Sequence, residues 1–130
     1  MAFSPKHILA IDDNEAVRDV IVTMLQEHGY RVTAAGDGLS MREILQRDDP
    51  VDAIVLDALM PGEQSATLAR HARDLNIPVV MISGSHDQII FARDNGLQLL
   101  QKPFQYRELI DAIAEALDSG KPGQRSEIHG

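Results

Sequence analysis

Hydrophobic residues along this chain follow two different spacings. Short apolar runs, typical of buried parallel strands, alternate with stretches in which apolar residues recur every three or four positions, as in amphipathic helices. We expect five strands, at His7–Ile11, Arg31–Ala35, Ala53–Leu56, Val79–Ile82 and Leu97–Gln101. We expect five helices, at Glu15–Glu27, Ser40–Gln46, Glu63–Leu75, Asp87–Asn95 and Tyr106–Leu117.

Five strand–helix units in succession predict an α/β fold, a doubly wound, mostly parallel five-stranded sheet with helices on both faces. Parallel strands need right-handed crossovers, and helices provide them. A chain of 130 residues suffices for one compact domain. The periodicity stops near residue 118, so we expect a domain over residues 1–118 and a flexible C-terminal tail over 119–130. No output domain is expected after it.

Composition removes several classes of function. The formal net charge of −8, with basic residues scattered, argues against direct binding to nucleic acid. No apolar run approaches the ~20 residues that a membrane-spanning helix needs. The absence of cysteine gives no disulfide framework, so a cytoplasmic location is the default. The five histidines lack ligand spacing, which predicts surface positions and no zinc site.

Polar side chains follow four of the predicted strands. Asp12 and Asp13 come after the first strand, Asp57 after the third, Ser83 after the fourth and Lys102 after the fifth. Each alone is more typical of a turn or a helix cap. In an open α/β sheet, however, ligands bind beyond the carboxyl ends of the strands. Together these residues predict one functional site.

The predicted chemistry follows from the charges. Three carboxylates in one crevice repel one another, so cations must offset them. Lys102 supplies one positive charge, and the oxygen ligands suit Mg²⁺ as a second. A metal, an ammonium and a hydroxyl around one carboxylate are what phosphoryl transfer to that carboxylate requires. The turn Met60-Pro61-Gly62 then leads the chain away from Asp57.

Four segments, "AIDDNEAVRDVI", "VLDALMPG", "VVMISG" and "LLQKPF", carry a family resemblance. Over about residues 7 to 118 the chain resembles the response-regulator receiver domain of two-component signalling, in particular the stand-alone, chemotaxis-regulator-like kind. The resemblance implies a flavodoxin-like strand order of 2-1-3-4-5. It also implies a phospho-accepting switch that phosphorylates and dephosphorylates itself, rather than an enzyme with an external substrate.

The resemblance assigns the acceptor and metal roles. Asp57 matches the phosphoryl acceptor and a ligand of Mg²⁺. Asp13 matches the acid that binds Mg²⁺ directly, and Asp12 the neighbour that acts largely through water. Leu59 would offer its backbone carbonyl to the metal.

The remaining implied roles concern the phosphoryl group and the partners. Ser83 matches the hydroxyl that bonds a phosphoryl oxygen, and Lys102 the basic partner of the acceptor. The donor would be a phosphohistidine on a sensor histidine kinase or a phosphotransfer protein. The phosphorylated form would then bind a downstream protein target, as a monomer or a phosphorylation-dependent homodimer.

Three departures from the family pattern concern the readout. Leu99 stands where the family usually has an aromatic residue, and Ser65 where it commonly has glycine. The segments between Asp57 and Ser83 and between Ser83 and Lys102 are shorter than usual. The alternative function is therefore a degenerate receiver that acts as a constitutive scaffold. A haloacid-dehalogenase-like phosphatase fits less well, because its general acid would fall on Leu59.

Overall fold

The computed structural model describes residues 5–58, 65–84, 90, 93–94 and 97–119. Its centre is a parallel sheet of five strands, β1 (His7–Ile11), β2 (Arg31–Ala35), β3 (Ala53–Asp57), β4 (Val79–Ser83) and β5 (Gln98–Gln101). The helices in the described part are α1 (Glu15–Glu27), α2 (Gly38–Leu45), α3 (Ser65–Asp74) and α5 (Tyr106–Ser119). None of these helices is long and apolar enough to span a membrane.

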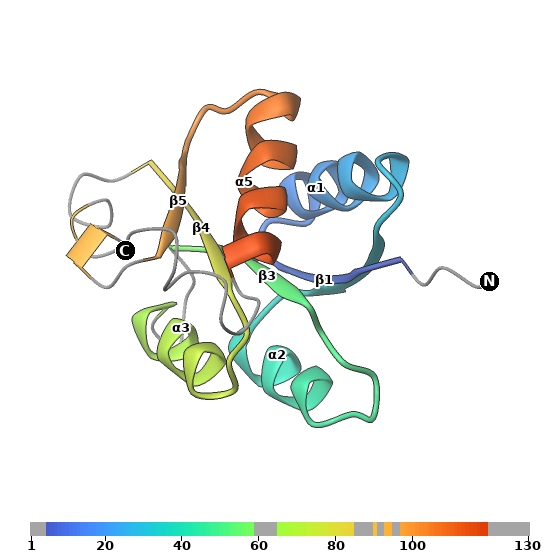
Figure 1. Ribbon diagram of the computed structural model, residues 1–130, viewed down its shortest axis with the longest axis vertical. Helices are drawn as coiled ribbons and strands as arrows, with labels where there is room; N and C mark the ends of the chain where they lie inside the picture. Colours follow the sequence, from blue (N-terminus) through green and yellow to red (C-terminus); the bar gives the residue numbers. More distant parts are fainter. Residues whose placement is uncertain (1–4, 59–64, 85–89, 91–92, 95–96, 120–130) are drawn as a thin grey trace.

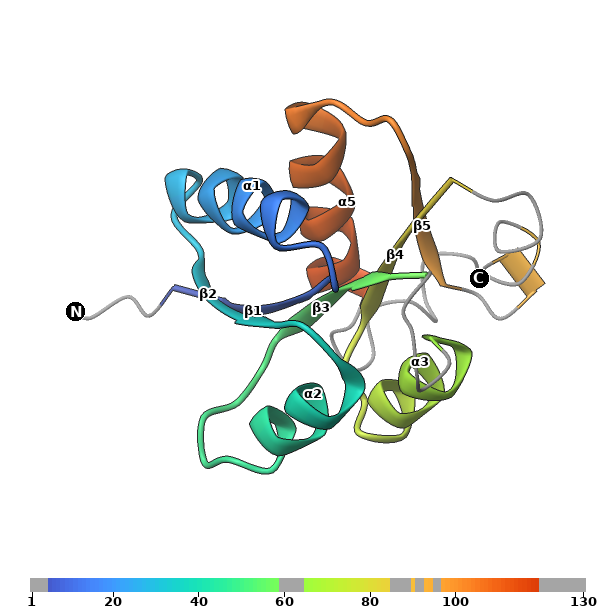
Figure 2. The ribbon, with the colours of Figure 1, turned by 180° about the vertical axis from the view of Figure 1, so that it is seen from behind.

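The strand order is β2-β1-β3-β4-β5, and every neighbouring pair is parallel. Helices α1 and α5 cover one face of the sheet, and α2 and α3 cover the other (Figures 1 and 2). The predicted doubly wound fold and its order of 2-1-3-4-5 are therefore confirmed. Most of the predicted helix 87–95 lies outside the described residues, so four of the five expected helices can be compared.

The hydrophobic core has two layers, one on each face of the sheet. Strand residues alternate between them, because successive side chains of a strand point to opposite faces. On the α1 and α5 side lie Ile8, Ala10, Ala53, Val55, Val80, Ile82, Ile21, Leu25, Leu109 and Ile113. On the α2 and α3 side lie Leu9, Ile11, Ile54, Leu56, Val79, Met81, Met41, Leu68 and Ala72. The three inner strands, β1, β3 and β4, are thus buried on both faces and form a rigid support for the residues at their ends.

Some boundaries of strands and helices differ from the prediction by one or two residues. Strands β3 and β4 each extend one residue further, so that Asp57 and Ser83 are the last residues of their strands. Helix α2 begins at Gly38 rather than Ser40, because Asp37 caps it and accepts a hydrogen bond from the Ser40 N–H at 2.8 Å. This hydrogen bond holds the pKa of the Asp37 carboxyl below its usual range.

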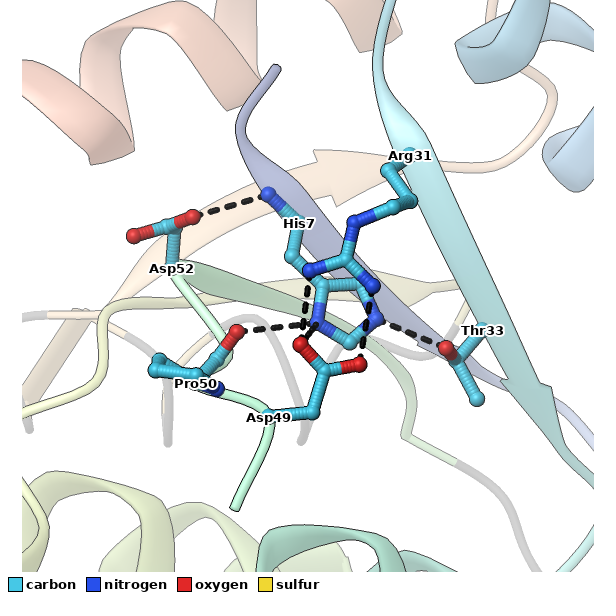
Figure 3. Close-up of polar contacts among 6 residues, drawn as sticks. All are labelled: His7, Arg31, Thr33, Asp49, Pro50 and Asp52. Atoms are coloured by element: carbon cyan, nitrogen blue, oxygen red, sulfur yellow. Dashed lines mark hydrogen bonds and ion pairs between the residues drawn. The ribbon is translucent and has the colours of Figure 1, made fainter. Parts of the chain in front are cut away.

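His7 is buried, with 2% of its surface exposed, so the predicted surface position is wrong for this histidine. Its ring lies among polar groups at the edge where the strands begin (Figure 3). Nδ1 lies 2.9 Å from the Pro50 carbonyl and Nε2 lies 2.7 Å from the Thr33 hydroxyl. Because a carbonyl only accepts, Nδ1 carries the proton, and in the neutral ring Nε2 accepts from Thr33. Two hydrogen bonds thus satisfy both ring nitrogens, which lets the histidine lie in the core.

An ion pair closes the same edge of the sheet (Figure 3). Both terminal nitrogens of Arg31 donate to the Asp49 carboxylate, at 2.8 and 2.7 Å. The Asp52 carboxylate accepts from the backbone N–H of His7 at 2.8 Å. We call His7, Arg31, Thr33, Asp49 and Asp52 the N-edge cluster. It ties the starts of β1 and β2 to the segment that leads into β3.

Candidate functional site

Three carboxylates meet at the opposite edge of the sheet, where the strands end. Asp12 and Asp13 follow β1, and Asp57 is the last residue of the neighbouring strand β3. One carboxylate oxygen from each lies within 4.8 Å of the other two. Asp12 and Asp57 are buried, and Asp13 is exposed. The structure therefore brings together the three acids that the sequence placed at one site.

The start of α1 explains why Asp12 and Asp13 remain available for this cluster. The cap of the helix is Asn14, whose side chain accepts a hydrogen bond from the Val17 N–H at 3.1 Å. The backbone N–H of Asn14 in turn donates to Asp12 Oδ1 at 2.9 Å. Asn14, rather than Asp12 or Asp13, is therefore the cap of α1.

The buried carboxylate of Asp12 provides a test of whether a cation fits here. Its Oδ1 accepts from Asn14, whereas no group in the described part of the chain donates to its buried Oδ2. A buried carboxylate oxygen is costly unless a donor or a cation compensates it. An oxygen-only donor set also suits Mg²⁺ better than softer metals. The acid cluster therefore fits the predicted Mg²⁺.

Lys102 supplies a positive charge beside the cluster. Its Nζ lies 3.6 Å from Asp57 Oδ1, and its side chain is 38% exposed, so water reaches it. The backbone N–H of Lys102 donates to the Ser83 carbonyl at 2.8 Å, and the Lys102–Pro103 peptide bond is cis. The end of β5 thus holds the lysine against the end of β4, next to the Asp57 carboxylate.

Ser83 closes β4 and is buried, with Asp57 on the adjacent strand. In the β3–β4 register Asp57 pairs with Ile82, so Ser83 lies one residue further along the same edge. Leu59, whose carbonyl the resemblance assigned to the metal, lies outside the described residues, as does the turn at Met60-Pro61-Gly62. Leu99 packs partly buried against the core layer on the α2 and α3 side.

The structure also identifies contacts that the sequence did not predict. Arg18 Nη1 donates to the backbone carbonyl of Asp12 at 2.8 Å. A Cβ on Gly36 would lie only 3.0 Å from this nitrogen, so the glycine leaves room for the guanidinium. In addition, Ser65 Oγ donates to the backbone carbonyl of Asp57 at 2.8 Å. Arg18 and Gly36 can both be read from the sequence, but nothing in their spacing predicted that they lie in contact.

Solved structures agree with this architecture. A CheY-like response regulator receiver domain protein from Methanospirillum hungatei JF-1 superposes with a TM-score of 0.80 at 25% identity, covering 90% of this chain and 97% of that chain. A response regulator receiver protein from Sinorhizobium medicae WSM419 gives a TM-score of 0.80 at 27% identity, covering 92% and 100%. The whole fold is thus shared with receiver domains.

Curated relatives point the same way. The chain is 37% identical over 125 residues to the response regulator MprA of Mycobacterium leprae, covering 92% of this chain and 54% of that protein. It is 32% identical over 117 residues to the regulatory protein VirG of Agrobacterium fabrum, covering 86% and 46%. The chain therefore spans about half the length of the curated relatives it matches. Residues 8–114 match the response regulator receiver domain family, and the chain belongs to that family.

Proposed function

We propose that the chain is a phosphorylation-controlled switch whose acceptor is Asp57. The observation that carries this proposal is the convergence of Asp12, Asp13 and Asp57 beside the ammonium group of Lys102. Negative groups around a nucleophilic carboxylate, offset by cations, suit the transfer of a highly charged phosphoryl group.

In the proposed reaction an Asp57 carboxylate oxygen attacks the phosphorus of a phosphohistidine. The O–P bond forms as the N–P bond breaks, and the departing imidazole nitrogen keeps the electron pair and takes up a proton from water. Hydrolysis of the acyl phosphate later returns Asp57 and inorganic phosphate. The protein is restored in each cycle and acts on itself, which makes it a signalling switch rather than an ordinary enzyme.

The surrounding residues have separate roles in this proposal. Asp12 and Asp13, with Asp57 and the Leu59 carbonyl, would hold Mg²⁺, which when bound neutralises charge on the phosphoryl oxygens. The Lys102 ammonium group pairs with Asp57 before transfer and with a phosphoryl oxygen after it. The Ser83 hydroxyl donates to another phosphoryl oxygen, which draws the end of β4 toward the acceptor.

The proposed partners follow from the same interpretation of the site. The receiver unit spans residues 1–118, and the donor is a sensor histidine kinase or a phosphotransfer protein. A downstream protein target, or a second copy of the chain, would bind the face formed by the predicted helix 87–95, β5 and α5. The location is the cytoplasm expected from the cysteine-free sequence. The second candidate, a constitutive scaffold with an idle Asp57, is favoured by Leu99 in place of an aromatic residue and by the short segments on either side of Ser83.

Intact-mass measurement tests the proposal. We expect one phosphoryl group per chain after incubation with Mg²⁺ and acetyl phosphate, and none without metal or in Asp57→Asn. A phosphatase would instead release phosphate continuously, far faster than the donor hydrolyses on its own, and no phosphorylated protein would accumulate. If the wild-type chain stays unlabelled in the presence of Mg²⁺, the constitutive scaffold remains as the candidate function.

A further inference from the structure

Ser65, the first residue of α3, makes an unusual contact with the proposed acceptor. Its hydroxyl donates a hydrogen bond to the backbone carbonyl of Asp57 at 2.8 Å, although the two residues are eight positions apart. Both partners are buried, and only 6% of the Ser65 surface is exposed. The hydroxyl proton of Ser65 is thus directed away from its own helix, to the end of β3.

The position of Asp57 in the sheet explains why this contact matters. On one side Asp57 pairs with Ile82 of β4. On the other side the β1–β3 pairing ends at Ile11 and Leu56, one residue before Asp57. A sheet hydrogen bond continues past Asp57, from the Ala58 N–H to the Ile82 carbonyl at 2.9 Å, and holds one side of the Asp57–Ala58 peptide group. The Ser65 hydroxyl holds the carbonyl on the other side of this group and connects it to a second element, the helix α3.

We propose that Ser65 is a positioning residue for phosphorylation, one that holds the backbone of Asp57 so that its carboxylate stays aimed at the incoming phosphoryl group. This inference rests on the proposed function. The Asp57 carbonyl and side chain share one Cα, so a rotation of the peptide group moves the carboxylate. Transfer rates are sensitive to displacements of about 1 Å in an attacking group. The contact of Ser65 is with the backbone carbonyl of Asp57, so its effect on the transfer is exerted through Asp57.

Three substitutions separate this role from a contribution to folding alone. Ser65→Ala and Ser65→Gly remove the hydroxyl, and Ser65→Thr keeps it. The matched control is Ala72→Gly. Ala72 is buried on the core face of α3, and glycine at this position weakens the helix without removing the Ser65 contact to Asp57. For each variant the rate of Asp57 phosphorylation is measured at saturating Mg²⁺ over a range of acetyl phosphate concentrations, together with the Tm.

We expect Ser65→Ala and Ser65→Gly to lower the maximal rate about fivefold, the size expected for one lost hydrogen bond that orients the nucleophile. The donor concentration at half-maximal rate should not change, because the effect of Ser65 is exerted through Asp57. Ser65→Thr should keep the wild-type rate. Ala72→Gly should lower the Tm at least as much as Ser65→Ala and leave the rate unchanged.

Three results overturn the positioning role while the proposed function stands. The first is a labelled wild type with no slowing in Ser65→Ala. The second is an Ala72→Gly control slowed as much as Ser65→Ala. The third is a Ser65→Thr variant that melts like the wild type yet is as slow as Ser65→Ala. A wild type that takes no phosphoryl group under these conditions overturns the proposed function and the positioning role together.

Discussion

Asp57 is held between groups of opposite charge. Two carboxylates lie within 4.8 Å of one of its oxygens, and one ammonium nitrogen lies 3.6 Å from Oδ1. The lysine therefore has two effects that can be separated. It offsets the negative charge that would otherwise attract Mg²⁺ more strongly, and in the proposed reaction it neutralises a phosphoryl oxygen.

Lys102→Gln separates these two effects. Removal of the positive charge leaves the acid cluster more negative, so we expect Mg²⁺ to bind roughly threefold to tenfold more tightly. The maximal rate of phosphorylation should fall at least about tenfold, because the negative charge of the phosphoryl oxygens in the transition state is no longer offset by the lysine ammonium group. Calorimetric titration with Mg²⁺ and intact-mass kinetics measure the two quantities, and Lys102→Arg, which keeps the charge, is the control. Weaker Mg²⁺ binding in Lys102→Gln would contradict this electrostatic description.

At the scale of elements, apolar spacing was enough to predict the fold, and side-chain contacts decided what it missed. The buried strands were found because both faces of the sheet are covered, which makes them apolar throughout. The predicted start of α2 was late because Asp37 caps the helix from outside the apolar pattern. His7 was misplaced because its burial depends on Pro50 and Thr33, which are distant in sequence.

The candidate site shows the same division. Asp12, Asp13, Asp57 and Lys102 could be predicted because the ends of parallel strands meet at one edge of a sheet. The contacts of Arg18 and Ser65 could not, because they depend on where a long side chain and a helix start lie in space. Sequence patterns thus locate these four residues, and the structure adds the contacts that Arg18 and Ser65 make beside them.

Helix α1 offers a prediction at this scale. Asn14→Ala removes the side chain that accepts from the Val17 N–H, and we expect the loss of about 1 kcal/mol of unfolding free energy. The Tm should fall by roughly 3–5 °C. Thermal unfolding followed by circular dichroism measures this. Asn14→Ser, which retains a capping oxygen, should lie near the wild type, and an equal loss in both variants would show that Asn14 is not the cap.

The whole molecule carries polar clusters at the two opposite edges of one sheet. The acids and Lys102 lie where the strands end, and the N-edge cluster lies where they begin. Between them the inner strands β1, β3 and β4 are buried on both faces. We therefore expect substitutions at the N-edge cluster to change stability and its pH dependence, with the phosphorylation chemistry left intact.

Asp49→Asn tests this separation. The Arg31 guanidinium, with a smaller contribution from nearby His7 and Arg47, holds the pKa of the Asp49 carboxyl below its ordinary value of 3.8. The unfolded chain binds this proton more readily, so the stabilisation is fully present above pH 3.8 and is lost as the pH falls through the folded-state pKa. The variant, which is not ionised, should therefore melt below the wild type at pH 7. The difference should shrink as both are acidified below the folded-state pKa.

The same samples test whether the two edges act independently. The phosphorylation rate of Asp49→Asn at pH 7, with Mg²⁺ and acetyl phosphate, should match that of the wild type, because every group of the acid cluster remains. Asp52, whose carboxylate accepts from the His7 N–H, is present in both proteins, so it cancels from the comparison. A difference in Tm that persists unchanged at acid pH would show that the Asp49 charge is not the source of the stabilisation. A slowed phosphorylation would show that the sheet transmits changes from one edge to the other.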